Sequence, residues 1–274
     1  MRSLAKYAGL PMEIDDDDRL VFGVGVAAVK PNVREFITVK NYLKNPLSTF
    51  PRREVYFIYR DVRRDGDAEK LKNAGLQYDL TVLPPGRIGN EFIKTIGHYH
   101  PYKPGTRVRY PEVYEVIHGR AFFILQSASD DFERLREVYV VEAGRGEKVL
   151  VPPGFGHMSI NPTPDALVLA NLQARGNHGL YEPYESHHGA AFYMTASARL
   201  SKSGRATPDY EFTPNLAYNA LPPLQHKRPR ELPQYNLLSA IPMYFSLQKN
   251  PASFDFLRNP ESYLDELTPE KLFR

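Results

Sequence analysis

Between residues 20 and 190, short runs of β-branched and aromatic residues dominate the sequence. Gly, Pro, Asp or Asn residues separate most of the runs, a pattern that does not suit long helices. Short strands joined by frequent turns are typical of a β-sandwich or a β-barrel. We therefore predict an all-β protein with strands at 54–62, 77–84, 91–100, 112–119, 121–126, 136–143, 147–153 and 166–173.

Helical segments are predicted to be few. Residues 38–45 are one candidate. A stronger one lies near the end of the chain, where Thr268 can cap a helix, Pro269 occupies its first position and Glu270 lies in its first turn. Gly119 ends the strand at 112–119, and we expect a tight hairpin from there into the following strand.

The character of the sequence changes beyond about residue 195, where Pro, Asn and Tyr are frequent and periodicity is weak. We therefore predict three parts. Residues 1–30 form an N-terminal extension, and residues 31–195 form the barrel. Residues 196–274 form a C-terminal extension that packs on the barrel or on a partner subunit.

Composition excludes several classes of protein. The net charge of +3 is small and the basic residues are scattered, which gives no electrostatic basis for binding nucleic acid or an anionic membrane. The chain has no cysteine, so disulfides, zinc fingers and thiol nucleophiles are excluded. The sequence shows neither a signal-peptide core nor an apolar run of membrane-spanning length, and we expect a cytoplasmic protein.

Residues 97–115, GHYHPYKPGTRVRYPEVYE, bring two histidines and two glutamates into a short stretch. His98 and His100 point to the same side of a strand because strand side chains alternate. On the next strand, Glu112 and Tyr114 share one face and Glu115 lies on the other. One glutamate can therefore join the histidines. We expect Glu115 on the solvent side, and it becomes the ligand instead of Glu112 if the long loop shifts the register by one residue.

A third histidine follows in the stretch GEKVLVPPGFGHMSIN, residues 146–161. A strand ends there in a Pro-Pro-Gly turn that delivers His157 to the start of the next strand. Three neutral imidazoles and one carboxylate would suit a divalent first-row transition metal, with coordination positions left open for a ligand.

These stretches resemble the two sequence motifs of the cupin superfamily. The second motif, Gly-x5-Pro-x-Gly-x2-His-x3-Asn, matches at every fixed position: Gly146, Pro152, Gly154, His157 and Asn161. The first motif matches at His98, His100, Glu112 and Gly119, with a longer loop before the glutamate than most cupins have. The resemblance implies a cupin jelly-roll antiparallel β-barrel that binds a metal inside through His98, His100, Glu112 and His157.

A closer similarity extends over residues 30–185, carried mainly by stretches 81–89, 95–100 and 112–114. These are similar to the cupin-type glucose-6-phosphate isomerases of archaea and some bacteria. The similarity implies a sugar-phosphate pocket lined by Thr81, Thr95, Gly97, Tyr114 and Tyr181, with His178 near the substrate.

The function implied is a metal-dependent aldose–ketose isomerase that interconverts glucose 6-phosphate and fructose 6-phosphate in glycolysis and gluconeogenesis. Glu112, Tyr114 and His157 would be its catalytic residues. One divalent transition metal is expected per subunit, with iron favoured and manganese, zinc or nickel as alternatives. A homodimer is expected, with no nucleic acid or membrane partner.

The sequence departs from this pattern at two places, which keep alternatives open. A pocket tyrosine of the family has no counterpart, because Leu172 or Gln173 stands there. The loop 101–111 adds Lys103, Arg107 and Arg109, which could bind phosphate or reshape the pocket. The alternatives are an isomerase of another sugar phosphate, an iron dioxygenase, or a metal-free carbohydrate-binding cupin. A dioxygenase pocket would be apolar, which Thr81, Thr95 and Tyr114 oppose.

Overall fold

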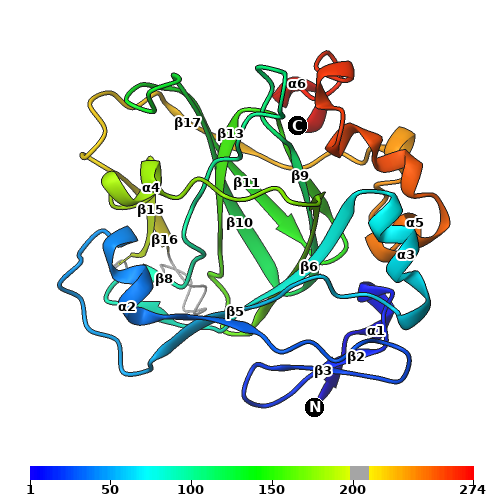
Figure 1. Ribbon diagram of the computed structural model, residues 1–274. Coiled ribbons are helices and arrows are strands. Elements are labelled where there is room, and N and C mark those ends of the chain that lie inside the picture. Colours follow the sequence, from blue (N-terminus) through cyan, green and yellow to red (C-terminus); the bar gives the residue numbers. More distant parts are fainter. Residues whose placement is uncertain (198–209) are drawn as a thin grey trace.

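Two antiparallel sheets curve around one interior in the computed structural model, which describes residues 1–197 and 210–274 (Figure 1). The larger has the strand order β12-β9-β14-β6-β5-β4, and the other is β13-β10-β11-β17. The larger sheet consists of β4 (Asn32–Glu35), β5 (Glu54–Tyr59), β6 (Leu76–Leu83), β9 (Glu112–His118), β12 (Lys148–Val151) and β14 (Leu167–Ala174). The facing sheet consists of β10 (Arg120–Ala128), β11 (Leu135–Gly144), β13 (Phe155–Ile160) and β17 (Leu224–Lys227), of which β11 and β17 are parallel.

Smaller sheets and short helices surround the barrel. One small sheet, of order β1-β2-β3, consists of β1 (Arg2–Ser3), β2 (Met12–Ile14) and β3 (Leu20–Phe22). The other, of order β16-β15-β8-β7, consists of β7 (Arg87–Ile88), β8 (Glu91–Phe92), β15 (Phe192–Ala196) and β16 (Tyr210–Pro214). The helices are α1 (Ala5–Ala8), α2 (Phe36–Val39), α3 (Ala68–Asn73), α4 (Glu182–Ser186), α5 (Met243–Lys249) and α6 (Pro269–Leu272). Short 3-10 turns are η1 (Lys40–Tyr42), η2 (Asp65–Asp67), η3 (Pro233–Tyr235), η4 (Pro251–Leu257) and η5 (Pro260–Ser262). This architecture confirms an all-β barrel with few helices.

The predicted strand 91–100 is shorter than expected. Only Glu91–Phe92 forms a named strand, and the chain beyond it pairs through isolated bridges, Lys94 with Ile160, His98 with His157 and Tyr99 with Leu180. The segment therefore pairs with different parts of the chain in turn and does not form one regular ladder. The side chains of His98 and His100 nevertheless reach the same site, as alternation predicts.

The predicted hairpin at Gly119 is wrong. β9 and β10 belong to different sheets, and Gly119 makes the corner between them with a left-handed φ of 85°. A Cβ there would lie 3.1 Å from the carbonyl oxygen of Ala166, so glycine meets both the backbone and the space requirement.

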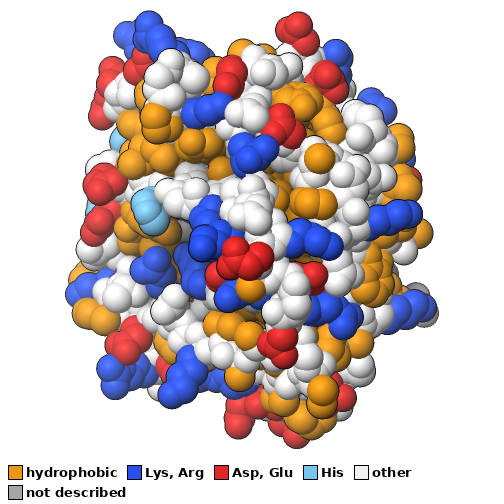
Figure 2. All heavy atoms as spheres, turned by 45° about the vertical axis from the view of Figure 1, so that its right-hand side comes forward, with side chains coloured by type: hydrophobic (Ala, Val, Ile, Leu, Met, Phe, Trp, Pro, Cys, Tyr) orange, Lys and Arg blue, Asp and Glu red, His pale blue; other side chains and the backbone are white. Residues whose placement is uncertain are grey.

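The two predicted helices are present with changed boundaries. The first begins earlier, at Phe36, and continues as the 3-10 turn Lys40–Tyr42. The last begins at Pro269 as expected, but Thr268 makes no side-chain capping hydrogen bond. No helix in residues 1–197 or 210–274 is long and apolar enough to span a membrane. Acidic and basic side chains are interspersed over the face shown in Figure 2.

Much of the described C-terminal segment, 210–274, packs on the barrel. β17 extends the sheet beside β11, and the backbone N–H of Met243, at the start of α5, donates to the Glu115 carboxylate at 2.9 Å. The segment after β17 lies along one side of the barrel, at the right of Figure 1. Residues 198–209 of the predicted C-terminal extension lie outside the described residues.

The exposure of Glu115, on the outer face of β9, differs from the prediction. Glu115 is 1% exposed, and its carboxylate lies 2.8 Å from the ammonium of Lys148. The expectation of a solvent-side Glu115 is wrong because residues 237–244 cover this face: the Lys148 ammonium also donates to the carbonyl of Leu238 at 2.7 Å.

Candidate metal centre

Three histidines and one glutamate converge inside the barrel. His98 and His100 come from the chain between β8 and β9, Glu112 begins β9, and His157 lies on β13. One ligand atom from each side chain lies within 4.8 Å of all the others. His98 is partly buried, whereas the other three side chains are buried.

Backbone pairing fixes the two histidine-bearing segments against each other. The His98 N–H donates to the His157 carbonyl at 3.2 Å, and the His157 N–H donates back to the His98 carbonyl at 3.0 Å. The pairing sets the imidazoles side by side, with ring centroids 4.4 Å apart. Because the site draws on both sheets, it exists only in the closed barrel.

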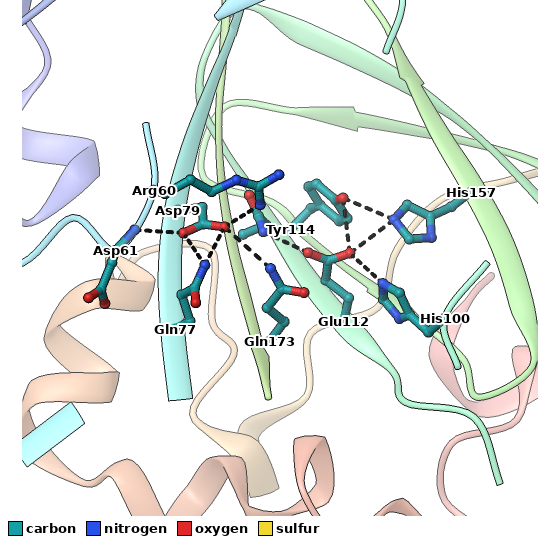
Figure 3. Close-up of polar contacts among 10 residues, drawn as sticks. Arg60, Asp61, Gln77, Asp79, His100, Glu112, Tyr114, His157 and Gln173 are labelled. Atoms are coloured by element: carbon teal, nitrogen blue, oxygen red, sulfur yellow. Dashed lines mark hydrogen bonds and ion pairs between the residues drawn. The ribbon is translucent and has the colours of Figure 1, made fainter. Parts of the chain in front are cut away.

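The Glu112 carboxylate is the centre of one of the two groups of polar contacts in Figure 3. Its Oε2 lies 2.9 Å from His157 Nε2 and 3.4 Å from His100 Nε2. The amide of Asn171 donates to Oε1 at 2.6 Å, and the Tyr114 hydroxyl donates to Oε2 at 3.0 Å. Burial alone would raise the pKa of Glu112, but the adjacent imidazoles hold it well below the ordinary value.

The electrostatics of the histidines favour their neutral form. Burial and the neighbouring imidazoles lower the pKa of His98 well below its usual value, and burial lowers the pKa of His157. Neutral imidazole is the form that binds metals. An apposed carboxylate and neutral imidazoles are thus ready for a cation at neutral pH.

The His100 ring has an unsatisfied nitrogen on the side of the cluster. Nδ1 lies 2.8 Å from the carbonyl of Tyr110, which can only accept, so Nδ1 carries the proton. The buried Nε2 has no hydrogen-bond partner within the described part of the chain and lies on the Glu112 side. A backbone carbonyl that orients a ligating imidazole in this way is the usual support of a metal site. The donor set of three nitrogens and one carboxylate therefore fits a divalent first-row metal.

A cavity of about 370 Å³ adjoins the four-residue group. Register places Tyr114, Asn171 and Asp79 opposite one another on β9, β14 and β6. Ile58 on β5 faces Thr81 on β6 in the same way. Of the residues predicted for the pocket, the lining includes Thr81, Thr95, Tyr114, His178 and Tyr181, together with His98 and Glu112.

Gly97 lies apart from this cavity wall. It is buried, and a Cβ at this position would lie 2.1 Å from the ring of Tyr184. The close approach of that ring accounts for the glycine. The predicted pocket position beside Leu172 is filled by Gln173, which lines the cavity, whereas Leu172 is buried on the other face of β14.

The added cations of loop 101–111 are engaged outside the cavity. Lys103 donates to Asn259 at 2.7 Å, and Arg107 lies 3.6 Å from Asp130. Arg109 donates to the carbonyl of His100 at 2.7 Å and so supports the histidine segment from behind. None of the three lines the cavity beside the four-residue group, so the loop does not supply its charge.

The cations that do line the cavity were missed by sequence reasoning. They are Arg34 on β4 and Arg60, which follows β5. Alternation from Tyr56 through Ile58 could have placed Arg60 on the interior face. A buried network holds it: Asp79 accepts from Arg60 at 2.6 Å, from the Asp61 N–H at 2.8 Å and from Gln77 at 3.0 Å (Figure 3).

An antiparallel barrel with three histidines and a glutamate converging inside is the architecture of a cupin. The sequence profile of the glucose-6-phosphate isomerase (GPI) family matches residues 35–210, and the chain belongs to this family. The family similarity predicted from stretches 81–89, 95–100 and 112–114 is confirmed.

Individual relatives are similar over part of their length. The glucose-6-phosphate isomerase of Thermococcus litoralis is 34% identical over 108 residues, covering 39% of this chain and 46% of that protein. The enzyme of the same name from Thermococcus gammatolerans is 31% identical over 126 residues, covering 46% of this chain and 56% of that protein. The chain thus matches about half the length of these curated relatives.

Solved structures similar to the chain include oxalate decarboxylase from Bacillus subtilis. The structure at pH 4.6 has 19% sequence identity and a TM-score of 0.32, and the match covers 46% of this chain and 28% of that one. Family membership follows from the sequence matches.

Proposed function

We propose that the protein is a metal-dependent aldose–ketose isomerase that interconverts glucose 6-phosphate and fructose 6-phosphate, a step of glycolysis and gluconeogenesis. The observation that carries this proposal is a four-residue His/Glu group beside a polar cavity, in a chain of the glucose-6-phosphate isomerase family. The cavity wall offers hydroxyls and amides that suit a sugar, including Thr81, Asn171 and Gln173.

His98, His100, Glu112 and His157 would hold one divalent first-row metal. When bound, it would supply Lewis-acid polarisation of the sugar carbonyl and hold neighbouring oxygens in position. Iron is the favoured metal, with manganese, zinc and nickel as alternatives. Imidazole ligands are compatible with all four.

The reaction must move a hydrogen between C1 and C2 and a proton between the two oxygens. Tyr114 is suited to the oxygens, because its hydroxyl lies 3.0 Å from Glu112 and 2.9 Å from His157. This arrangement lets one phenol orient a sugar oxygen and exchange a proton with either neighbour. Glu112 is the proposed base for the carbon-bound proton, acting through a cis-enediol, and Asn171 fixes its orientation.

Thr81, Thr95, His178 and Tyr181 are the proposed substrate-binding residues. They surround the cavity from β6, from the chain before His98 and from the segment before α4. His178 is exposed and Tyr181 partly buried, so both lie where a substrate would enter. Gly97 is retained as a proposed contact only through its backbone, since its Cα faces the ring of Tyr184.

A coupled assay of glucose 6-phosphate formation from fructose 6-phosphate, with oxygen uptake recorded alongside, tests the proposal. We expect turnover without oxygen consumption. Oxygen uptake without turnover would instead support an iron dioxygenase, and turnover of a different sugar phosphate alone would support an isomerase of another substrate.

The sugar phosphates of this reaction are cytoplasmic metabolites, and we propose the cytoplasm as the site of action. A homodimer is proposed from the family resemblance, and the mass in solution tests it.

A further inference from the structure

One cation in the cavity has no acidic partner. Arg34 is partly buried and lines the cavity from β4. Within residues 1–197 and 210–274 it forms no ion pair, and its guanidinium carbon lies 5.6 Å from the centre of the Tyr181 ring. A charge in such a recess loses hydration without gaining a counter-ion. An anionic ligand would supply that counter-ion.

A second guanidinium is held rigidly in the same cavity. Arg60 is bonded to Asp79, a carboxylate that is 0% exposed, at 2.6 Å. Asp79 also accepts from Gln77 and from the backbone N–H of Asp61, so it fixes the position of Arg60 and balances its charge. The Arg60 side chain is 38% exposed and lines the cavity, and a guanidinium has five N–H donors, more than Asp79 uses.

The two guanidiniums act on the same region. Arg34 lies opposite Tyr56 in the β4–β5 ladder, and Arg60 follows the end of β5. Both side chains line the same cavity, together with Tyr56. The wall of the cavity therefore contains two guanidinium groups.

A neutral side chain of the same cavity also lacks a partner. The side chain of Asn177 lines the cavity, and both its amide nitrogen and its oxygen are buried without a hydrogen-bond partner in the described part of the chain. A buried amide N–H without a partner can donate a hydrogen bond to a ligand bound in the cavity.

The charges that line the cavity do not balance. Glu112 belongs to the metal group and Asp79 neutralises Arg60, which leaves the charge of Arg34 in excess. We propose that Arg34, assisted by Arg60 and Asn177, forms an anion-binding end that takes the phosphate monoester of the substrate. The inference rests on the proposed function and assigns the phosphate to residues other than the predicted hydroxyl and glycine positions. Guanidinium groups suit this role because their N–H groups match phosphate oxygens.

Calorimetric titration with glucitol 6-phosphate, which cannot be isomerised, and with glucitol isolates the phosphate contribution. We expect Arg34→Met to weaken glucitol 6-phosphate binding by roughly ten- to a hundredfold and leave glucitol binding unchanged, the range for a lost charge-assisted hydrogen bond. Arg34→Lys should restore part of the affinity. Arg87→Met, at an exposed residue of β7 outside the cavity, is the matched control and should bind as the wild type does.

Arg60 is tested by Arg60→Lys, which keeps a cation beside the buried Asp79 and is expected to weaken the same binding. The phosphate assignment is overturned if Arg34→Met binds glucitol 6-phosphate as tightly as the wild type. It is overturned equally if the wild type does not distinguish glucitol 6-phosphate from glucitol.

Steady-state assays of the same proteins separate this inference from the proposed function. Phosphate-dependent binding without fructose 6-phosphate turnover would refute the isomerase and leave the anion-binding end intact. Turnover with the same KM in Arg34→Met and wild type would refute the anion-binding end and leave the isomerase intact. Equal melting temperatures establish that the Arg34 variants are folded.

Discussion

Glu112 Oε2 and His157 Nε2 lie 2.9 Å apart, although the two residues belong to strands of different sheets. The contact joins β9 to β13 across the interior, and His100 lies beside it at 3.4 Å from the same oxygen. A cation bound there would be held by both halves of the barrel. The metal content of the protein should therefore depend on single side chains of each sheet.

Replacing His98 and His157 together by alanine should abolish metal binding, because two of three imidazole donors are lost. Elemental analysis of the purified variant should show the metal reduced from one equivalent to a trace. His226→Ala removes an exposed histidine outside the cluster and is the matched control. Full stoichiometry in the double variant would exclude the proposed ligands.

Replacing Tyr114 by phenylalanine should reduce kcat while the metal is retained. The hydroxyl bonds both Glu112 and His157, and loss of a hydrogen bond to a charged group costs about 1.5–3 kcal/mol, or roughly ten- to a hundredfold in rate. Tyr193→Phe, outside the cavity, is the control. A kcat equal to that of the wild type would remove Tyr114 from the mechanism.

Metal binding should survive mild acidification. The lowered pKa values of His98 and His157 mean that protons compete with the metal only at a pH below the ordinary histidine value of about 6.5. The pKa of Glu112 is also held well below its ordinary value, so its carboxylate stays ionised under mild acidification. Metal content after equilibration between pH 8 and pH 4.5 should fall at a midpoint below 6.5, and release at a higher pH would contradict the neutral-histidine site.

The same shifts predict the stability of the metal-free protein. The folded-state pKa values of His98 and His157 are lower than their unfolded values. As the pH falls below about 6.5, the unfolded chain therefore takes up protons that the folded protein does not bind. The contribution of the two histidines to the free energy of unfolding is present above about pH 6.5 and is lost on acidification. Urea unfolding of the metal-free protein at pH 7.5 and 5.5 measures this loss of stability. A free energy of unfolding that rose on acidification would contradict neutral His98 and His157 in the folded protein.

The ion pair between Glu115 and Lys148 should stabilise the attachment of residues 237–244. Lys148→Met leaves the buried carboxylate unpaired and should lower the free energy of unfolding by about 3–5 kcal/mol. Arg107→Met, which breaks an exposed pair with Asp130, should cost less than about 1 kcal/mol. Replacing both Glu115 and Lys148 by apolar residues should recover part of the loss.

Urea unfolding of these variants measures the difference. A Lys148→Met protein as stable as Arg107→Met would show that the buried pair is not structural.

The sequence predicted the barrel strands because their apolar runs are short and bounded by turn residues, and local pattern is sufficient for such elements. It could also group His98, His100, Glu112 and His157, since the motifs fix their spacing. The grouping of residues from distant strands otherwise depends on the register between them.

The incorrect predictions share a physical origin in tertiary contacts. Glu115 alternates like a surface residue, but residues 237–244 cover its face of the sheet. Arg34 was missed because its position opposite Tyr56 depends on the β4–β5 pairing, which no local pattern reveals.

Removal of the metal followed by reconstitution tests the central claim most directly. The protein is treated with a chelator until elemental analysis finds no transition metal, and conversion of fructose 6-phosphate to glucose 6-phosphate is then measured before and after adding Fe²⁺, Mn²⁺, Ni²⁺ or Zn²⁺. We expect activity to be lost with the metal and to return with at least one of these ions, but not in the His98→Ala, His157→Ala variant. Undiminished turnover by the metal-free protein would contradict the metal-dependent isomerase.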